Sequence, residues 1–172
     1  MTTLKRRQGE FLDKVNQSRG VLYRICQLYT YNQEDWNDLW QDILFQLWRS
    51  YHLFQGKSSF STWMYRVALN TALMHRRKKK RQWFKVPLEN VNLSNSENPA
   101  VHRDEEVQLL FQCIKELSRI DRAIILLKLD QKSYREIAEI TGLSDSNISV
   151  RIVRIKEKLR QSLLQKGVKG DI

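Results

Sequence analysis

The sequence is poor in the residues that mark several classes of protein. Its 172 residues include two cysteines, two prolines and six glycines. Two cysteines cannot build a disulfide framework, and no CxxC motif or Cys/His cluster is present to bind zinc. The low glycine and proline content argues against a turn-rich all-β fold. A reducing compartment suits this composition best.

Long hydrophobic runs and catalytic motifs are absent as well. No apolar run approaches the roughly 18 residues that a membrane-spanning helix needs, and the N-terminus, MTTLKRRQGEFLDKV, lacks the apolar core of a signal peptide. We therefore expect a cytoplasmic protein without membrane insertion. There is no glycine-rich phosphate loop or nucleophile motif, and the three histidines are scattered. Neither an enzyme nor a bound cofactor is expected.

Negative charge is scarce relative to positive charge. Thirty Lys and Arg oppose 19 Asp and Glu, which gives a net charge of +11 and a pI near 9.8. This excess favours a polyanionic partner, either nucleic acid or an anionic membrane surface.

Both prolines lie in one polar stretch, residues 86–103, which predicts a linker. The chain then divides into residues 1–85 and 104–172, and both parts have helical apolar periodicity. We expect an all-α protein with two small helical domains.

The first part predicts three helical segments. An apolar stripe covers residues 11–29. Asn32 can cap a strongly amphipathic helix, which also carries a stripe of four acidic residues. A third helix begins near Phe60 and leads into the basic run RRKKKRQWFK at residues 76–85. In this helix we expect Phe60, Trp63 and Val67 in the core and Arg66, Asn70 and Arg77 nearer the surface. The basic run is either a solvated tail or a phosphate-binding segment whose neighbouring aromatics stack on unpaired bases.

The second part contains the most specific local signal, a helix-turn-helix. Ile137, Ala138 and Ile140 mark a short helix, Gly142 a turn, and Ser144 the cap of a longer helix. The polar N-terminal face of that longer helix is narrow enough to enter a major groove, and basic residues follow for phosphates. The expected DNA-binding residues are Ser146, Asn147, Ser149, Val150, Arg151, Arg154 and Lys156. The alternative is an ordinary helical hairpin with a solvated face.

The acidic stripe comprises Glu34, Asp35, Asp38 and Asp42. Asp38 and Asp42 lie one helical turn apart, a spacing that could hold a divalent metal in a nuclease. No second carboxylate pair or histidine ligand accompanies them, so a surface for a protein partner explains the stripe better than a metal site.

Two long segments resemble one family. NQEDWNDLWQDILFQLWRSYHLFQGKSSFSTWMYRVALNTALMHRRKKKR resembles region two of extracytoplasmic-function (ECF) RNA polymerase sigma factors, and KLDQKSYREIAEITGLSDSNISVRIVRIKEKLR resembles their region four. The resemblance implies region two at residues 1–85, a linker at 86–103 and region four at 104–172. It also implies a promoter-specificity subunit that opens DNA by binding energy alone.

The resemblance also implies roles for particular residues. Asp38, Leu39, Gln41 and Asp42 match the family's "DLVQE" helix, which docks on the polymerase clamp helices. A "FRGESSF" loop that captures a flipped base matches Phe54, Gly56, Lys57, Ser58, Ser59 and Phe60. The "YRIARN" helix, which reads the −10 element, matches at Arg66 and Asn70, and the basic Arg76 and Arg77 follow it. The recognition helix for the −35 element, "GTVKSRLHR", matches at Ser146–Arg154. Two positions differ: Ser149 stands where Lys or Arg is common in the family, and Val150 stands where Ser is common.

The implied partners are core RNA polymerase, through its clamp helices and flap, and promoter DNA, both duplex and single-stranded. An exposed polymerase-binding face would also suit an anti-sigma factor. The alternative function is a stand-alone helix-turn-helix regulator, which would leave the Trp-rich first part unexplained.

Overall fold

The described residues form only helices and connecting loops. The computed structural model describes residues 3–75 and 105–168, with side chains from Arg6 onward. The expected all-α class is confirmed. The first part contains α1 (Thr3–Gln17), α2 (Arg19–Tyr29), α3 (Gln33–Ser50), the 3₁₀ turn η1 (Tyr51–Leu53) and α4 (Phe60–Met74). The second part contains α5 (Glu105–Glu116), α6 (Arg119–Leu129), α7 (Tyr134–Thr141) and α8 (Asp145–Gln165).

Capping side chains account for most of the α-helix starts in the described residues. The Asn32 side chain accepts a hydrogen bond from the Asp35 amide, which starts α3 as expected. Ser144 does the same for the Asn147 amide at the start of α8. Between α7 and α8, Gly142 adopts φ = 76°, the left-handed conformation that ends a helix at little cost for glycine. The expected helix-turn-helix is therefore present in residues 134–165.

Two expectations about the first part need correction. The stripe over residues 11–29 is two helices, because the chain breaks at Ser18 between α1 and α2. In α4, Phe60, Trp63 and Val67 are only partly buried. The core face of α4 is instead formed by Thr62, Met64, Tyr65, Ala68, Leu69 and Ala72. The choice of face was wrong because α4 is sandwiched between α3 on one side and α6 and α7 on the other, so periodicity alone did not select it.

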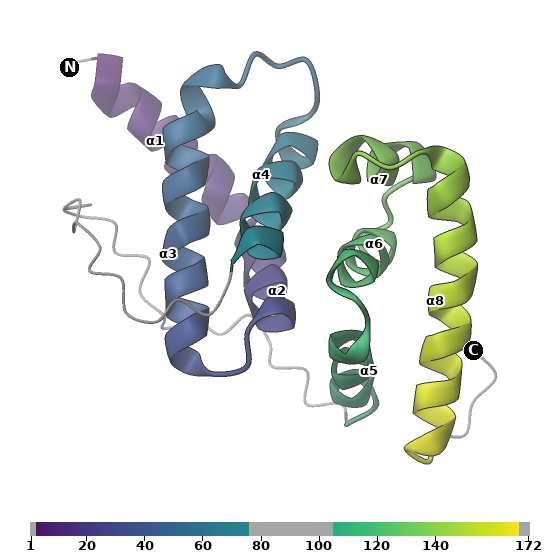
Figure 1. Cartoon of the computed structure of the whole chain (residues 1–172). Coiled ribbons are helices and arrows are strands. Elements are labelled where there is room, and N and C mark those ends of the chain that lie inside the picture. The colour runs from purple at the N-terminus through teal and green to yellow at the C-terminus, as the bar shows by residue number, and fades with distance from the viewer. Residues whose placement is uncertain (1–2, 76–104, 169–172) are drawn as a thin grey trace.

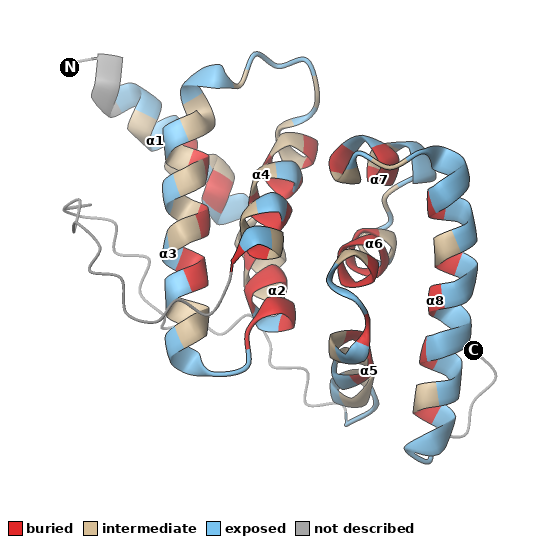
Figure 2. Cartoon of the chain, in the orientation of Figure 1, coloured by how far each residue is buried: buried red, intermediate tan, exposed pale blue. Residues whose placement is uncertain are grey.

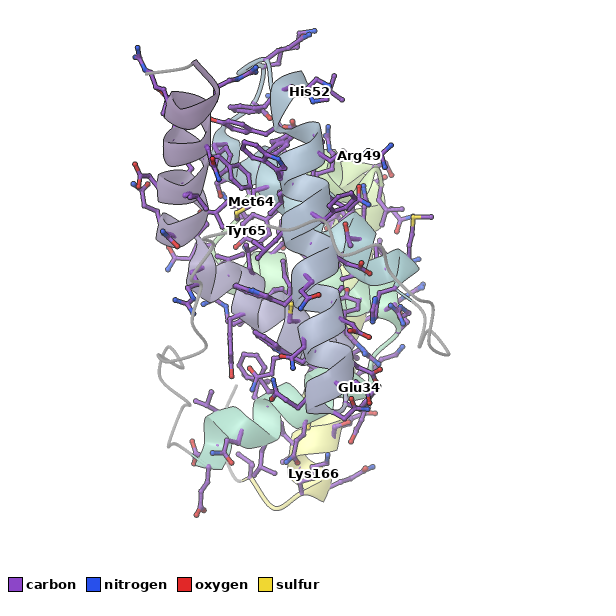
Figure 3. The ribbon with its side chains drawn as sticks, turned by 90° about the vertical axis from the view of Figure 1, so that its left-hand side faces the viewer. Glu34, Arg49, His52, Met64, Tyr65 and Lys166 are labelled. Carbon is purple, nitrogen blue, oxygen red and sulfur yellow. The ribbon has the colours of Figure 1, made fainter. Side chains whose placement is uncertain are left out.

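The two parts pack against each other. In Figure 1, α4 and α2 lie beside α6, with α7 near one end of α4 and α8 on the outer side of the second part. Figure 2 shows buried residues along the facing sides of these helices, while the outer face of α8 is exposed. Figure 3 shows α3 from outside: Met64 and Tyr65 lie in the interior, and Glu34 and Arg49 lie towards opposite ends of the helix.

Candidate nucleic-acid interface

A surface groove runs along the start of α8. Its lining includes five of the expected DNA-binding residues: Ser146, Asn147, Val150, Arg151 and Arg154. The opposite face of α8 is held in the core by a fully buried seam that includes Ile148, Ile152 and Ile155. This anchoring leaves the polar face in solvent, as an element that enters a major groove requires. Ser149 and Lys156 are exposed but lie outside the groove lining.

Arg151 is engaged within the protein. Its Nη1 lies 2.8 Å from Asp121 Oδ1 on α6, and its Nε donates to Asn147 Oδ1 at 2.8 Å. The sequence suggested Arg151 as a base or phosphate contact but did not suggest Asp121 as its partner, because the two residues are 30 positions apart.

A cluster of aromatic rings lies beside the loop that precedes α4. Phe54, Phe60 and Trp63 pack with centroid distances of 5.3–5.7 Å, and Tyr51 contacts the latter two. Gly56 turns the loop with φ = 71°, and Lys57 is exposed. Partly buried aromatics beside an exposed basic loop form a surface on which unpaired bases can stack.

Lys14 of α1 joins this cluster, although sequence reasoning missed it. Its ammonium lies 5.3 Å from the Phe60 ring centroid and 5.7 Å from that of Phe54, within the range of cation–π attraction. Only the fold brings α1 to this loop, and no motif in the sequence marks Lys14.

The expected readers on α4 are at the surface. Arg66 and Asn70 are both exposed. Arg66 already has partners on α7: its Nη2 donates to the Glu139 carbonyl at 2.5 Å and lies 3.7 Å from the Glu139 carboxylate. Arg76 and Arg77, with the rest of the basic run, fall outside the described residues.

The acidic face of α3 is partly available. Asp38 and Gln41 are exposed. Asp42 is half-buried and lies 3.4 Å from Nδ1 of the buried His75. Leu39 is completely buried, so the expectation that it contacts a partner needs correction: it supports α3 from inside the core. Among residues 3–75 and 105–168, no group of three or more His, Cys, Asp or Glu side chains could hold a metal ion.

One carboxylate connects three helices across the two parts. Asp130, directly after α6, accepts hydrogen bonds from Arg24 of α2 and from the Tyr65 hydroxyl of α4, both at 2.5 Å. Burial and the Asp130 carboxylate raise the pKa of Tyr65, so its hydroxyl remains a donor.

Arginines of α6 make a second set of links. The buried Arg122 donates to the Leu28 carbonyl at 3.0 Å and to the Tyr31 hydroxyl at 3.2 Å. Arg119 donates to the carbonyls of Ala72 and His75 at the end of α4. These charged groups are satisfied mainly by backbone carbonyls, an arrangement that a sequence pattern does not reveal.

The arrangement defines a class: an all-helical protein in which a helix-turn-helix is joined to a second helical part with an aromatic and basic loop. A family model for Sigma-70 region 2 matches residues 15–82, and one for Sigma-70 region 4 matches residues 108–159. The chain belongs to the ECF RNA polymerase sigma factors. It is 32% identical over 135 residues to the ECF RNA polymerase sigma-E factor of Escherichia coli K12, covering 71% of this chain and 70% of that protein.

Further relatives extend the similarity. The chain is 28% identical over 181 residues to the ECF RNA polymerase sigma factor SigG of Mycobacterium tuberculosis, covering 90% of this chain and about half (49%) of SigG. The fold resembles the sigma factor RpoE of Bartonella quintana, solved with the anti-sigma factor NepR, with a TM-score of 0.68, 21% identity and coverage of 90% and 96%. It also resembles CnrH, solved with the cytosolic domain of CnrY, with a TM-score of 0.65, 20% identity and coverage of 94% and 91%. No helix within the described ranges is long and apolar enough to cross a membrane.

Proposed function

We propose that this protein directs core RNA polymerase to specific promoters and helps open the DNA there. One observation carries the proposal: a single chain combines a region-2 match that contains the aromatic loop with a region-4 match that contains the exposed α8 groove. The protein acts through binding energy, without a chemical step of its own. Residues 1–85 form the first domain, 86–103 the linker and 104–172 the second domain.

The polymerase contact is assigned to the outward face of α3. Asp38 and Gln41 present a carboxylate and an amide to solvent, and Asp42 adds a second carboxylate at the edge of that face. On a molecule of net charge +11, an acidic face selects a basic partner surface and disfavours DNA at that place.

The −10 element is assigned to the loop and to the exposed face of α4. Phe54, Phe60 and Trp63 offer ring faces to a base that has left the stack, and Arg66 and Asn70 follow along α4. Because stacking on such a surface is worth about 1–3 kcal/mol per base, binding of unpaired bases favours the open strands. The same loop contains the exposed Lys57 and Ser59 and the partly buried Ser58.

The −35 element is assigned to the α8 groove. Val150 is half-exposed and suits the methyl group of thymine, while Asn147 and Arg154 offer donors to base edges or phosphates. Ser149 and Lys156 are exposed outside the groove lining, and we assign them to the flanking phosphate backbone.

Engaging both elements requires the two parts to separate. Promoter elements centred about 25 base pairs apart span about 85 Å of B-DNA at about 3.4 Å per base pair. A compact chain of this length has a radius of gyration of only about 16 Å. The contacts of Asp130, Arg119 and Arg122 would then break, and Arg66 would be released from Glu139.

The test is reconstitution with purified core RNA polymerase. The full chain should co-elute with core polymerase in the presence of excess competitor DNA. The complex should also start transcription at discrete sites on a genomic DNA library. If the protein binds duplex DNA but not core polymerase, it is a stand-alone helix-turn-helix regulator and the proposal fails. An anti-sigma factor is a further proposed partner, because the sigma factor RpoE of Bartonella quintana, whose structure has this fold, was solved with the anti-sigma factor NepR.

A further inference from the structure

A buried carboxylate lies beneath the candidate recognition helix. Asp121 is 7% exposed and sits in the first turn of α6, where the Ser118 side chain caps the helix and the helix dipole favours a negative charge. The carboxylate points to Arg151 of α8, at 2.8 Å. Because Asp121 is fixed by burial, it gives Arg151 a defined anchor.

The anchor extends to a second residue of the groove. Arg151 also donates from Nε to the Asn147 side-chain oxygen at 2.8 Å. Two of the five guanidinium N–H donors are therefore committed inside the protein. With its oxygen facing Arg151, the Asn147 amide directs its N–H donors elsewhere, towards a base acceptor such as purine N7.

Asp121 also lies where DNA is proposed to bind. It lines the same groove as Ser146, Asn147, Val150 and Arg154. A carboxylate in this place repels phosphate, so it weakens binding to any DNA sequence. Asp121 compensates for this by orienting Arg151. A long arginine side chain loses conformational entropy when it binds a base, and this loss is smaller when the side chain is already held in place.

We propose that Asp121 is a positioning residue for −35 recognition: it orients Arg151 and, through it, Asn147. The inference rests on the proposed promoter-binding function. It distinguishes α8, which contacts the bases, from α6, which sets the geometry of two of the reading side chains. A merely structural ion pair between α6 and α8 would affect stability and leave base preference unchanged.

The experiment is binding-site selection from a duplex library with a randomised ten-base-pair segment, using the full chain with core polymerase. We compare the wild type with Asp121→Asn, which keeps the size of the side chain and removes its charge. The variant should lose about tenfold discrimination at the one or two positions read by Arg151 and Asn147 and keep its preference elsewhere. Its affinity for a duplex lacking the selected motif should rise about threefold.

Two further variants make the result specific. Glu157→Gln also removes one carboxylate from this domain, but Glu157 is exposed on α8, pairs with Arg160 and lies outside the groove lining; its selected motif should match the wild type. Arg151→Ala should lose discrimination at the same positions as Asp121→Asn. The double variant should lose no more than either single variant, because the two residues act as one unit.

An unchanged motif in a folded Asp121→Asn protein would overturn the proposal, with folding checked by helical circular dichroism. If Asp121→Asn does not fold, Arg151→Ala decides: a motif unchanged from the wild type would equally overturn the proposal. Failure of the proposed function gives a different result, in which wild-type protein with core polymerase selects no motif and starts no transcription.

Discussion

Replacement of Asp130 tests whether one carboxylate holds the two halves together. Asp130→Ala removes the acceptor shared by Arg24 and the Tyr65 hydroxyl. Tyr65 is 2% exposed, so its hydroxyl would be left buried without this partner, which costs about 1–3 kcal/mol. The Arg24 side chain is 33% exposed and regains water, so loss of that pair adds only about 0.5–1 kcal/mol. The expected total is about 1.5–4 kcal/mol.

The assay combines urea unfolding with small-angle X-ray scattering. A weaker interface lowers the unfolding midpoint, or, where the halves separate while folded, raises the radius of gyration above the roughly 16 Å of the compact chain. Glu139→Gln is the matched control, because the Glu139 carboxylate contacts Arg66 across the same interface at 3.7 Å with both side chains 46% exposed. It should change stability by less than about 1 kcal/mol.

A double-mutant cycle isolates the hydroxyl contact. Tyr65→Phe removes the hydrogen bond and leaves the ring in the core. The combined Asp130→Ala and Tyr65→Phe protein should be less destabilised than the sum of the single variants by about 1–2 kcal/mol. If Asp130→Ala leaves both the midpoint and the radius of gyration unchanged, the reasoning about this interface is refuted.

Three other residues give sharp expectations. Hydrogen bonds from the Ser133 backbone and side chain lower the pKa of Glu136 below its usual 4.5. The stability that this cap contributes is therefore complete above pH 4.5 and is lost as the pH falls through the lowered pKa. Glu136→Gln should flatten the dependence of unfolding free energy on pH in that acid range, and an unaltered profile would contradict the capping argument. Gly142→Ala should lower the free energy of unfolding in urea by about 1–2 kcal/mol. The cost comes from the backbone, because a φ of 76° is unfavourable for alanine even though the surrounding space is open. An equally stable variant would show that the turn can change conformation. Asp38→Arg should weaken co-elution with core polymerase about tenfold or more and leave helical circular dichroism unchanged, whereas undiminished co-elution would remove Asp38 from the polymerase contact.

Short-range features of this protein were predictable from sequence. Caps such as Asn32 and Ser144 act on amides three residues away, so the residues that form them are visible as neighbours in the chain. The helix-turn-helix is equally local, because a capping box at Ser133, a left-handed Gly142 and the α8 seam occupy about thirty consecutive residues. The family resemblance was recognisable in the same segments, and the comparisons confirm it.

Burial within a helix was less predictable. Leu39 was expected at a contact surface and is fully buried, and the α4 core face is formed by Met64, Tyr65 and Ala68 instead of Phe60 and Trp63. An amphipathic pattern shows which residues share a face, but the neighbouring helices decide which face is covered when a helix is packed on more than one side.

The amino-acid sequence by itself determined the helical class, the positions of most helix starts, the recognition helix and its basic character. These depend on hydrogen bonds and periodicities that extend over a few residues. Only the tertiary structure decided that Asp121 holds Arg151, that Lys14 lies over the aromatic loop and that Asp130 joins α2 and α4 to the end of α6. Those contacts join residues 30 to 106 positions apart. Their geometry depends on how whole helices pack, which no local pattern encodes.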